Sequence, residues 1–166
     1  VERLESLAKR QVRIQGEAQP TISENELYNL SIRKGTLTEE ERLIIQNHAA
    51  ISIKMLSQLP FSKTLKHVPE YAGGHHEKLN GQGYPQGLTS EQLPLQARIL
   101  AVADVFEGLT ASDRPYRQPM LLKKAMEIVR FMVSDGELDE RIVDVFEASG
   151  VVRAYAEKEL LPTQFD

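Results

Sequence analysis

Apolar residues recur at helical spacing along most of this chain, and the pattern predicts an all-α fold. The expected helices cover residues 23–30, 38–58, 62–78, 95–111, 119–133, 139–148 and 151–161, after a charged amphipathic stretch over 2–13. The helix over 62–78 is expected to be interrupted around Pro69 and Gly73-Gly74. Residues 14–22 read as a loop. No segment alternates between apolar and polar residues as a half-buried strand does. The expectation is a single helical domain with an N-terminal arm.

Two of these helices begin with the residue pairs of a capping box, in which a hydroxyl and a carboxylate three residues later satisfy each other's backbone N–H groups. The pairs are Ser23 with Glu26 and Thr38 with Glu41. On the second helix, one stripe repeats at helical spacing and consists of Ile44, His48, Ile51 and Met55. This stripe predicts that His48 points inward with the core face.

Glycine and proline crowd residues 79–94, so this segment is expected to be a loop. The breakers are Gly81, Gly83, Pro85, Gly87 and Pro94. Glycine suits positions where the backbone turns sharply or approaches another group closely. Tyr84 in this loop is a candidate to stack on a base or to pack as a lid, and an ordinary surface loop is the alternative.

A carboxylate and two adjacent histidines are the candidate metal ligands. Asp104 is the one charged residue between Ile99 and Phe106, and a buried carboxylate needs a partner or a metal. The alternative is that Asp104 faces solvent or pairs with Arg98. His75 and His76 would point about 100° apart on a helix, which suits two ions or opposite sides of a cluster. The alternatives are a surface pair for these two and a core histidine for His48.

Basic residues concentrate just after the Asp104 segment. Between Gly108 and Lys124 there are four basic residues and one acidic residue, Asp113, in a chain whose net charge is −4. The guanidinium groups of Arg114 and Arg117 suit phosphate oxygens. Salt bridges to the acidic stretch 135–147 are the alternative.

Composition narrows the classes of function. The 166 residues contain no cysteine, so a metal would be held by His, Asp, Glu or water, which favours iron, manganese or zinc. The acidic balance makes general nucleic-acid binding unexpected. No apolar run is long enough to span a membrane, and a cytoplasmic protein is expected. The chain starts at Val1 without the features of a signal peptide, and we expect it to be a fragment of a longer polypeptide.

Taken together, these motifs resemble the HD-GYP subfamily of HD-domain metal-dependent phosphohydrolases. The resemblance covers about Leu30 to Leu161 and rests on GTLTEEER, His48, HHE at 75–77, GYP at 83–85, ARILAVAD at 97–104 and LTASDRPYR at 109–117. It implies an HD-domain-like helical bundle that hydrolyses cyclic di-GMP to the linear dinucleotide, and in some members to GMP.

The resemblance also implies roles for individual residues. The implied ligands of two or three divalent metal ions, usually iron or manganese, are His48, His75, His76 and Asp104. The full set of ions is expected in the complete domain, and partial or no occupancy is expected in this chain alone. Arg114 and Arg117 match the basic edge that contacts the substrate phosphates. Tyr84 belongs to the GYP loop, which lines the substrate groove or meets a partner such as a diguanylate-cyclase domain. The family suggests an upstream receiver or sensor domain of bacterial two-component signalling, and a homodimer is compatible with it.

Two features depart from the family pattern. None of the four histidines is followed by aspartate, so the His-Asp pair that names the family is missing, together with its lysine. We expect residues 1–30 to be a helical insert or N-terminal arm, residues 31–166 to be the larger part of the domain, and the pair to lie upstream of Val1. The alternative is natural degeneracy, with Gln19-Pro20 at roughly that place. The second departure is Asn80, where an aspartate is usual.

Two functions therefore compete. The first is a cyclic di-GMP phosphodiesterase of which this chain is an incomplete catalytic domain, inactive or nearly so by itself. The second is a degenerate module that binds a nucleotide or a signalling partner without catalysis. A purely structural helical domain leaves Asp104 and the paired histidines unexplained.

Overall fold

A computed structural model describes residues 2–14, 16–32, 37–112 and 119–165. Helices dominate these residues, and the one sheet among them is a two-stranded hairpin, so the predicted all-α class is confirmed. The chain forms two compact units, residues 1–45 and 46–166. No helix in the described ranges combines the length and apolar character needed to cross a membrane.

The first unit contains α1 (Glu2–Ala8), β1 (Gln11–Ile14), β2 (Glu17–Pro20) and α2 (Glu24–Leu30). The capping box of Ser23 and Glu26 is present at the start of α2, as predicted. The hairpin is a correction, because residues 11–20 were expected to be the end of the charged amphipathic stretch and the start of a loop, and no strand was expected. The strands pair in antiparallel register from Gln11 with Pro20 to Ile14 with Glu17. Gly16 lies in the turn with φ +91°, a conformation that glycine adopts without steric cost.

Helix α3 (Glu39–Leu56) starts in the first unit and continues into the second. Its predicted capping box is confirmed, because the Thr38 N–H donates to Glu41 and the Glu41 N–H donates to Thr38 Oγ1. The predicted core stripe is wrong. Ile44, Ile51 and Met55 are 73%, 47% and 67% exposed, and His48 is exposed too.

The covered face of α3 is offset by about one residue from the predicted stripe. Ala49 is buried, and Ile53 packs so closely on Gly73 that a Cβ at Gly73 would lie 2.1 Å from Ile53 Cγ1. A step of one residue rotates a helix by about 100°, which moves the expected stripe out of the contact. His48 consequently lies at the edge of the face that packs.

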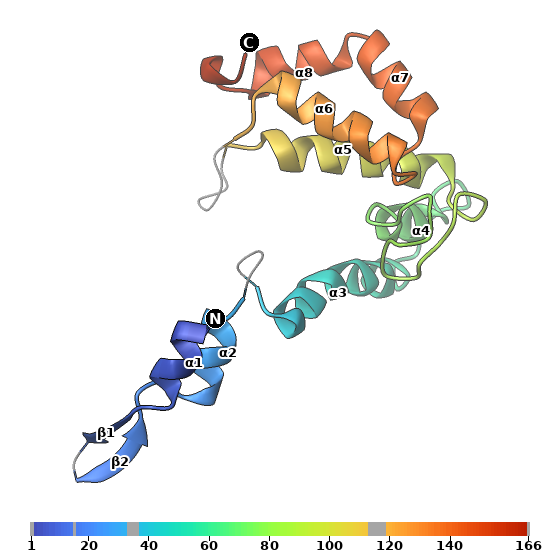
Figure 1. Cartoon of the computed structure of the whole chain (residues 1–166). Coiled ribbons are helices and arrows are strands. Elements are labelled where there is room, and N and C mark those ends of the chain that lie inside the picture. The colour runs from blue at the N-terminus through green and yellow to red at the C-terminus, as the bar shows by residue number, and fades with distance from the viewer. Residues whose placement is uncertain (1, 15, 33–36, 113–118, 166) are drawn as a thin grey trace. The chain divides into compact units, whose positions relative to one another are not determined.

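The remaining helices of the second unit are α4 (Val68–Gly73), α5 (Leu95–Thr110), α6 (Leu122–Ser134), α7 (Glu140–Ala148), α8 (Val151–Glu159) and a 3-10 turn, η1 (Pro162–Gln164). Helices α5 to α8 lie within a few residues of their predicted bounds, and Figure 1 shows them side by side. The helix predicted over 62–78 is shorter, because only Val68–Gly73 is helical. The loop predicted over 79–94 is confirmed, with one isolated bridge between Asn80 and Thr89.

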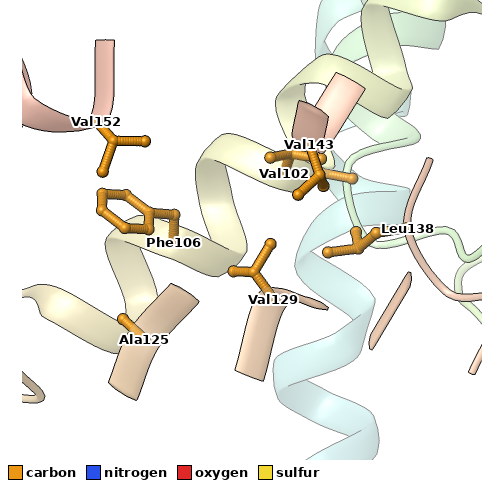
Figure 2. Close-up of a cluster of buried hydrophobic side chains, with 8 residues drawn as sticks. Val102, Phe106, Ala125, Val129, Leu138, Val143 and Val152 are labelled. Atoms are coloured by element: carbon orange, nitrogen blue, oxygen red, sulfur yellow. The ribbon is translucent and has the colours of Figure 1, made fainter. Parts of the chain in front are cut away.

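The core of the second unit joins α5, α6, α7 and α8 (Figure 2). Its buried side chains are Ala101, Val102, Phe106, Ala125, Val129, Leu138, Val143 and Val152. Phe106 meets the rings of Phe146 and Tyr155 edge-on, at centroid distances of 5.1 and 5.6 Å. Aromatic rings favour such edge-to-face contacts because of their quadrupoles. This core gives α5 a fixed position, and α5 carries Asp104.

A buried glutamine closes the C-terminal end of this core. Gln164 is 2% exposed, and its Nε2 donates to the carbonyl oxygens of Thr110 and Met120 at 2.8 and 3.0 Å. Its Oε1 accepts from the Leu161 N–H at 3.0 Å. A buried amide is stable only when its polar atoms are paired, and here both are. Gln164 therefore ties η1 to the end of α5 and to the residues that lead into α6.

Candidate metal centre

Two glycines place the turn that carries the paired histidines. Gly73 ends α4 against Ile53 of α3, and Gly74 lies where a Cβ would be 3.0 Å from Ala97 of α5. Side chains at these positions would push α4 away from both neighbouring helices. The turn that follows therefore sits between α3 and α5, and it delivers His75 and His76 to the space between His48 and Asp104.

The three predicted histidine ligands come together. One ligand nitrogen from each of His48, His75 and His76 lies within 4.8 Å of the other two. The Nε2 atoms of His48 and His76 are 3.2 Å apart. His75 and His76 lie in a turn rather than on a helix, so the 100° separation expected from a helix does not apply. Their ring centroids are only 4.1 Å apart.

The donor set fits a divalent ion. Two nitrogen ligands at about 2.1 Å from one ion lie roughly 3.0–3.4 Å apart at octahedral or tetrahedral angles. The 3.2 Å between the Nε2 atoms of His48 and His76 falls in this range. His75 Nδ1 donates to the Ala72 carbonyl at 2.5 Å, which leaves its Nε2 lone pair free to bind a metal. A backbone carbonyl that fixes the tautomer in this way is the usual support of a histidine ligand.

Asp104 approaches the cluster through His76. Its Oδ2 lies 3.6 Å from His76 Nδ1, on the side of the ring opposite to His48, and its side chain is 43% exposed. This position suits a carboxylate that orients a histidine ligand, and the role of Asp104 as a direct ligand stays a prediction. The alternative partner, Arg98, instead binds Asp139 at 2.9 Å and donates to the carbonyls of Leu93 and Ser90.

The surroundings of His76 change its protonation equilibrium. Burial lowers its pKa below the ordinary value of 6.5, and the neighbouring His75 and His48 lower it further, while Asp104 opposes them. A lowered pKa keeps the imidazole neutral at physiological pH, and neutral imidazole is the form that binds metal.

The glycine-rich loop brings Tyr84 over the histidines. The Tyr84 ring lies 4.7 Å from the His76 ring and 6.5 Å from the His48 ring between centroids. The Tyr84 N–H donates to the His76 carbonyl at 3.2 Å. Burial, and then Asp104, raise the pKa of the Tyr84 hydroxyl above 10. Tyr84 thus belongs to the same site, and its contact with a substrate stays a prediction.

Glu77, directly after the paired histidines, has a role that sequence reasoning did not assign. Its side chain is 3% exposed and accepts from the backbone N–H groups of Gln86 and Leu88 at 2.7 and 2.9 Å. The partners are main-chain groups nine and eleven residues away, so no side-chain spacing signals them. The Glu77 carboxylate therefore binds the backbone of the GYP loop and is not one of the clustered metal ligands.

The unusual Asn80 has a structural explanation. Its Oδ1 accepts from the Gln82 N–H at 3.0 Å, and its Nδ2 donates to the Asp135 carbonyl at 3.2 Å. An aspartate could make only the first of these bonds when ionised. Nearby, Lys78 Nζ binds Glu137 Oε1 at 2.5 Å, and the Leu79 N–H donates to the Glu137 carbonyl. The loop is therefore tied to the turn between α6 and α7.

The predicted phosphate ligands Arg114 and Arg117 lie outside the described residues. The acidic stretch proposed as their alternative partner has other cations nearby. Glu137 binds Lys78, Asp139 binds Arg98, and Asp144 and Glu147 both bind Arg130.

Comparison with known proteins identifies the family. A family model described as HD domain matches residues 23–142. The chain is 46% identical over 113 residues to 3'3'-cGAMP-specific phosphodiesterase 1 of Vibrio cholerae, which is 68% of this chain and 25% of that protein. It is 36% identical over 135 residues to the cyclic di-GMP phosphodiesterase response regulator RpfG of Xanthomonas campestris, covering 81% of this chain and 33% of the relative.

A third relative is the cyclic di-GMP phosphodiesterase of Thermotoga maritima, with 39% identity over 94 residues, 57% of this chain and 25% of the relative. The chain spans between a quarter and a third of the length of these three relatives. The division predicted at residue 30 stays a prediction. The resemblance predicted from the motifs is confirmed, and the chain belongs to the HD-domain family.

Proposed function

We propose that this chain is the metal-binding part of a cyclic dinucleotide phosphodiesterase. The observation that carries the proposal is the cluster of His48, His75 and His76, with Asp104 against His76 and Tyr84 over it. The named activities of the relatives support the same substrate class. Iron and manganese are the predicted metals.

The residues of the chain divide the work of such a site. Bound divalent ions would supply an activated hydroxide and neutralise charge on the phosphoryl group. The three histidines would hold the ions, and Asp104 would keep the His76 ring in the orientation that its carboxylate favours. The Tyr84 hydroxyl, whose pKa burial and Asp104 raise above 10, is protonated at neutral pH and could donate to a phosphate or base oxygen. The Tyr84 ring would bound the site on the side of the His76 ring, 4.7 Å away between centroids.

The substrate is proposed as cyclic di-GMP, and 3'3'-cGAMP is the second candidate. The Xanthomonas and Thermotoga relatives carry names that refer to cyclic di-GMP, and the Vibrio relative carries one that refers to cGAMP. Both substrates contain two phosphodiester bonds in one ring and differ in one base. The metal site serves either, so the choice must depend on contacts with the bases.

Regulation and partners form a separate part of the proposal. The response-regulator name of the Xanthomonas relative supports a link with a receiver domain. Docking of a diguanylate-cyclase domain through the GYP loop, and a homodimer, stay predictions. A binding module without catalysis is the competing function, because the four histidines include no His-Asp pair.

Turnover of both cyclic dinucleotides with Mn²⁺ or Fe²⁺ tests the proposal, with linear products separated by chromatography. The assay uses this chain and the natural protein that contains it. We expect hydrolysis by the natural protein and little or none by the chain alone, since coordination without the His-Asp pair is incomplete. If both samples bind a cyclic dinucleotide and neither hydrolyses it, the binding module is favoured.

Two histidine variants control for the site. In the natural protein, His76→Gln removes a ligand and should lower turnover by about 100-fold or more, the upper end of what loss of a ligand's support alone costs. His67→Gln makes the same chemical change outside the cluster, where His67 pairs with Glu70 at 3.0 Å and stacks on Tyr71. Equal turnover in the two variants would contradict the proposed site.

A further inference from the structure

The GYP loop wraps around the residues that follow His76. A Cβ at Gly83 would lie 2.4 Å from both Glu77 Cα and Lys78 N, so the loop backbone touches the backbone of residues 77 and 78 directly. The next residue, Tyr84, donates its N–H to the His76 carbonyl. The loop and the metal-binding turn therefore share an interface of main-chain atoms.

The carboxylate of Glu77 completes this interface. It is almost fully buried and accepts from the N–H groups of Gln86 and Leu88, which lie just beyond Tyr84. Burial of a carboxylate is costly without such partners, so its presence here requires the loop in this path. The Gly83 contact and the carboxylate of Glu77 therefore fix the backbone before and after Tyr84. We call these two contacts the loop clamp.

On one side of the loop clamp, packing contributes less to holding the loop in place. A cavity of about 720 Å³ has Glu77, Gln86 and Leu88 in its wall. That side of the loop faces a cavity rather than packed side chains, so hydrogen bonds carry more of the task of fixing it. The opposite end of the loop is tied separately, by Asn80 to Asp135 and by Lys78 to Glu137.

We infer that Glu77 is a positioning residue of the metal centre. Its carboxylate fixes the 83–88 segment, the segment seats the Tyr84 ring against His76, and the seated ring holds His76 toward His48. The inference rests on the proposed function for its meaning in catalysis, while its structural content can be tested separately. Glu77 acts through Tyr84 and touches neither a metal ligand side chain nor a substrate in this account.

Glu77→Gln is the informative change, because the amide keeps the size of the side chain but replaces one acceptor oxygen by a donor. Glu70→Gln is the matched control, since Glu70 lines the same cavity and is half exposed. Val143→Ala is a second control that weakens the core far from the loop in sequence and leaves the loop clamp intact.

Three quantities are measured for the wild type and for each of the three variants. They are amide hydrogen exchange at Gln86 and Leu88, the proton NMR contact between the Tyr84 and His76 rings, and the Mn²⁺ dissociation constant by calorimetry. For Glu77→Gln we expect at least about tenfold faster exchange, a weakened ring contact, and a Mn²⁺ dissociation constant raised about tenfold, the lower end of what loss of ligand support costs. Both controls should match the wild type in all three.

Unchanged exchange, ring contact and metal affinity in Glu77→Gln would overturn the inference, and so would an equal loss of affinity in Val143→Ala, which would reveal a general stability effect. Absence of both Mn²⁺ binding and cyclic dinucleotide hydrolysis in the natural protein that contains this chain would count against the proposed function. In that case the ring contact decides: its loss in Glu77→Gln supports the inference, and its persistence overturns it.

Discussion

His76 links the protonation of the site to the stability of the fold. Burial and two neighbouring histidines lower its folded-state pKa below 6.5. Between the folded and unfolded pKa values, the unfolded chain binds more protons, so stability falls as the pH drops below about 6.5. The slope from one such group is at most about 1.4 kcal/mol per pH unit, and the loss ends once the pH is below the folded-state pKa.

We therefore expect the metal-free protein to lose stability between neutral and mildly acidic pH more steeply than His76→Gln does. Urea unfolding at a series of pH values measures the difference. Gln58→Ala, which changes an exposed side chain that does not titrate, serves as the control and should follow the wild-type curve. Parallel curves for the wild type and His76→Gln would show that His76 does not titrate as its surroundings require.

Asn80 is expected to stabilise this loop more than an aspartate at the same position would. Asn80→Asp turns the bond to the Asp135 carbonyl into an approach of two oxygens and should cost about 0.5–1.5 kcal/mol at neutral pH. Below the pKa of the new carboxyl group, the protonated side chain can donate again, so part of the loss should be recovered. Asn25→Asp is the control, because Asn25 Oδ1 only accepts, from Asn29.

At the scale of single residues, sequence reasoning found the residues with distinctive chemistry. The histidines and Asp104 stand out by type and by their family motif, and the structure brings them together. Glu77 was not assigned because its partners are backbone N–H groups, which any residue at positions 86 and 88 would offer. The tautomer of His75 depends on the Ala72 carbonyl for the same reason.

At the scale of elements, the short 3-10 turn η1 is expected to contribute more to the free energy of unfolding than its length suggests. Gln164→Ala removes three hydrogen bonds and leaves a small cavity beside Thr110, which should cost about 2–4 kcal/mol. Urea unfolding measures the loss. Gln58→Ala, at an exposed glutamine, should stay within about 0.5 kcal/mol of the wild type.

Helices with a buried face were predicted correctly from the sequence, and the hairpin, which has an exposed strand, was not. Helices α5, α6, α7 and α8 pack on one core. The apolar residues of α6, α7 and α8 recur on one face, and α5 is apolar almost throughout, so both patterns were recognisable. The hairpin of β1 and β2 was missed because β2 is exposed at all four positions, and a strand with no buried face shows no alternation. On α3, the densest apolar stripe is exposed, so the stripe alone selected the wrong face.

At the scale of the whole molecule, the two units differ in what holds them together. Among the described side chains up to Ile45, no hydrophobic one is fully buried, whereas the second unit has a continuous core. All three clustered histidines belong to the second unit. Metal binding should therefore stabilise that unit and leave the first nearly unaffected.

Scanning calorimetry with and without Mn²⁺ tests this. At a free metal concentration of 100 times the dissociation constant, the second unit should gain about 2.7 kcal/mol, which raises its Tm by roughly 10 °C for a unit of this size. EDTA should reverse the shift. The His48→Gln variant should show a much smaller one, and an equal shift in that variant would place the metal elsewhere.

Gly83 has a consequence for genetic experiments. Its backbone lies against residues 77 and 78 with no room for a Cβ, although glycine itself contributes no reactive group. In a saturation-mutagenesis screen scored on activity, position 83 should be as intolerant as the metal-binding histidines. Variants at Gly83 should lose protection of the loop amides together with activity, whereas histidine variants should lose activity alone. A map of intolerant positions would thus combine two classes, residues that perform the reaction and residues that fix the path of the loop.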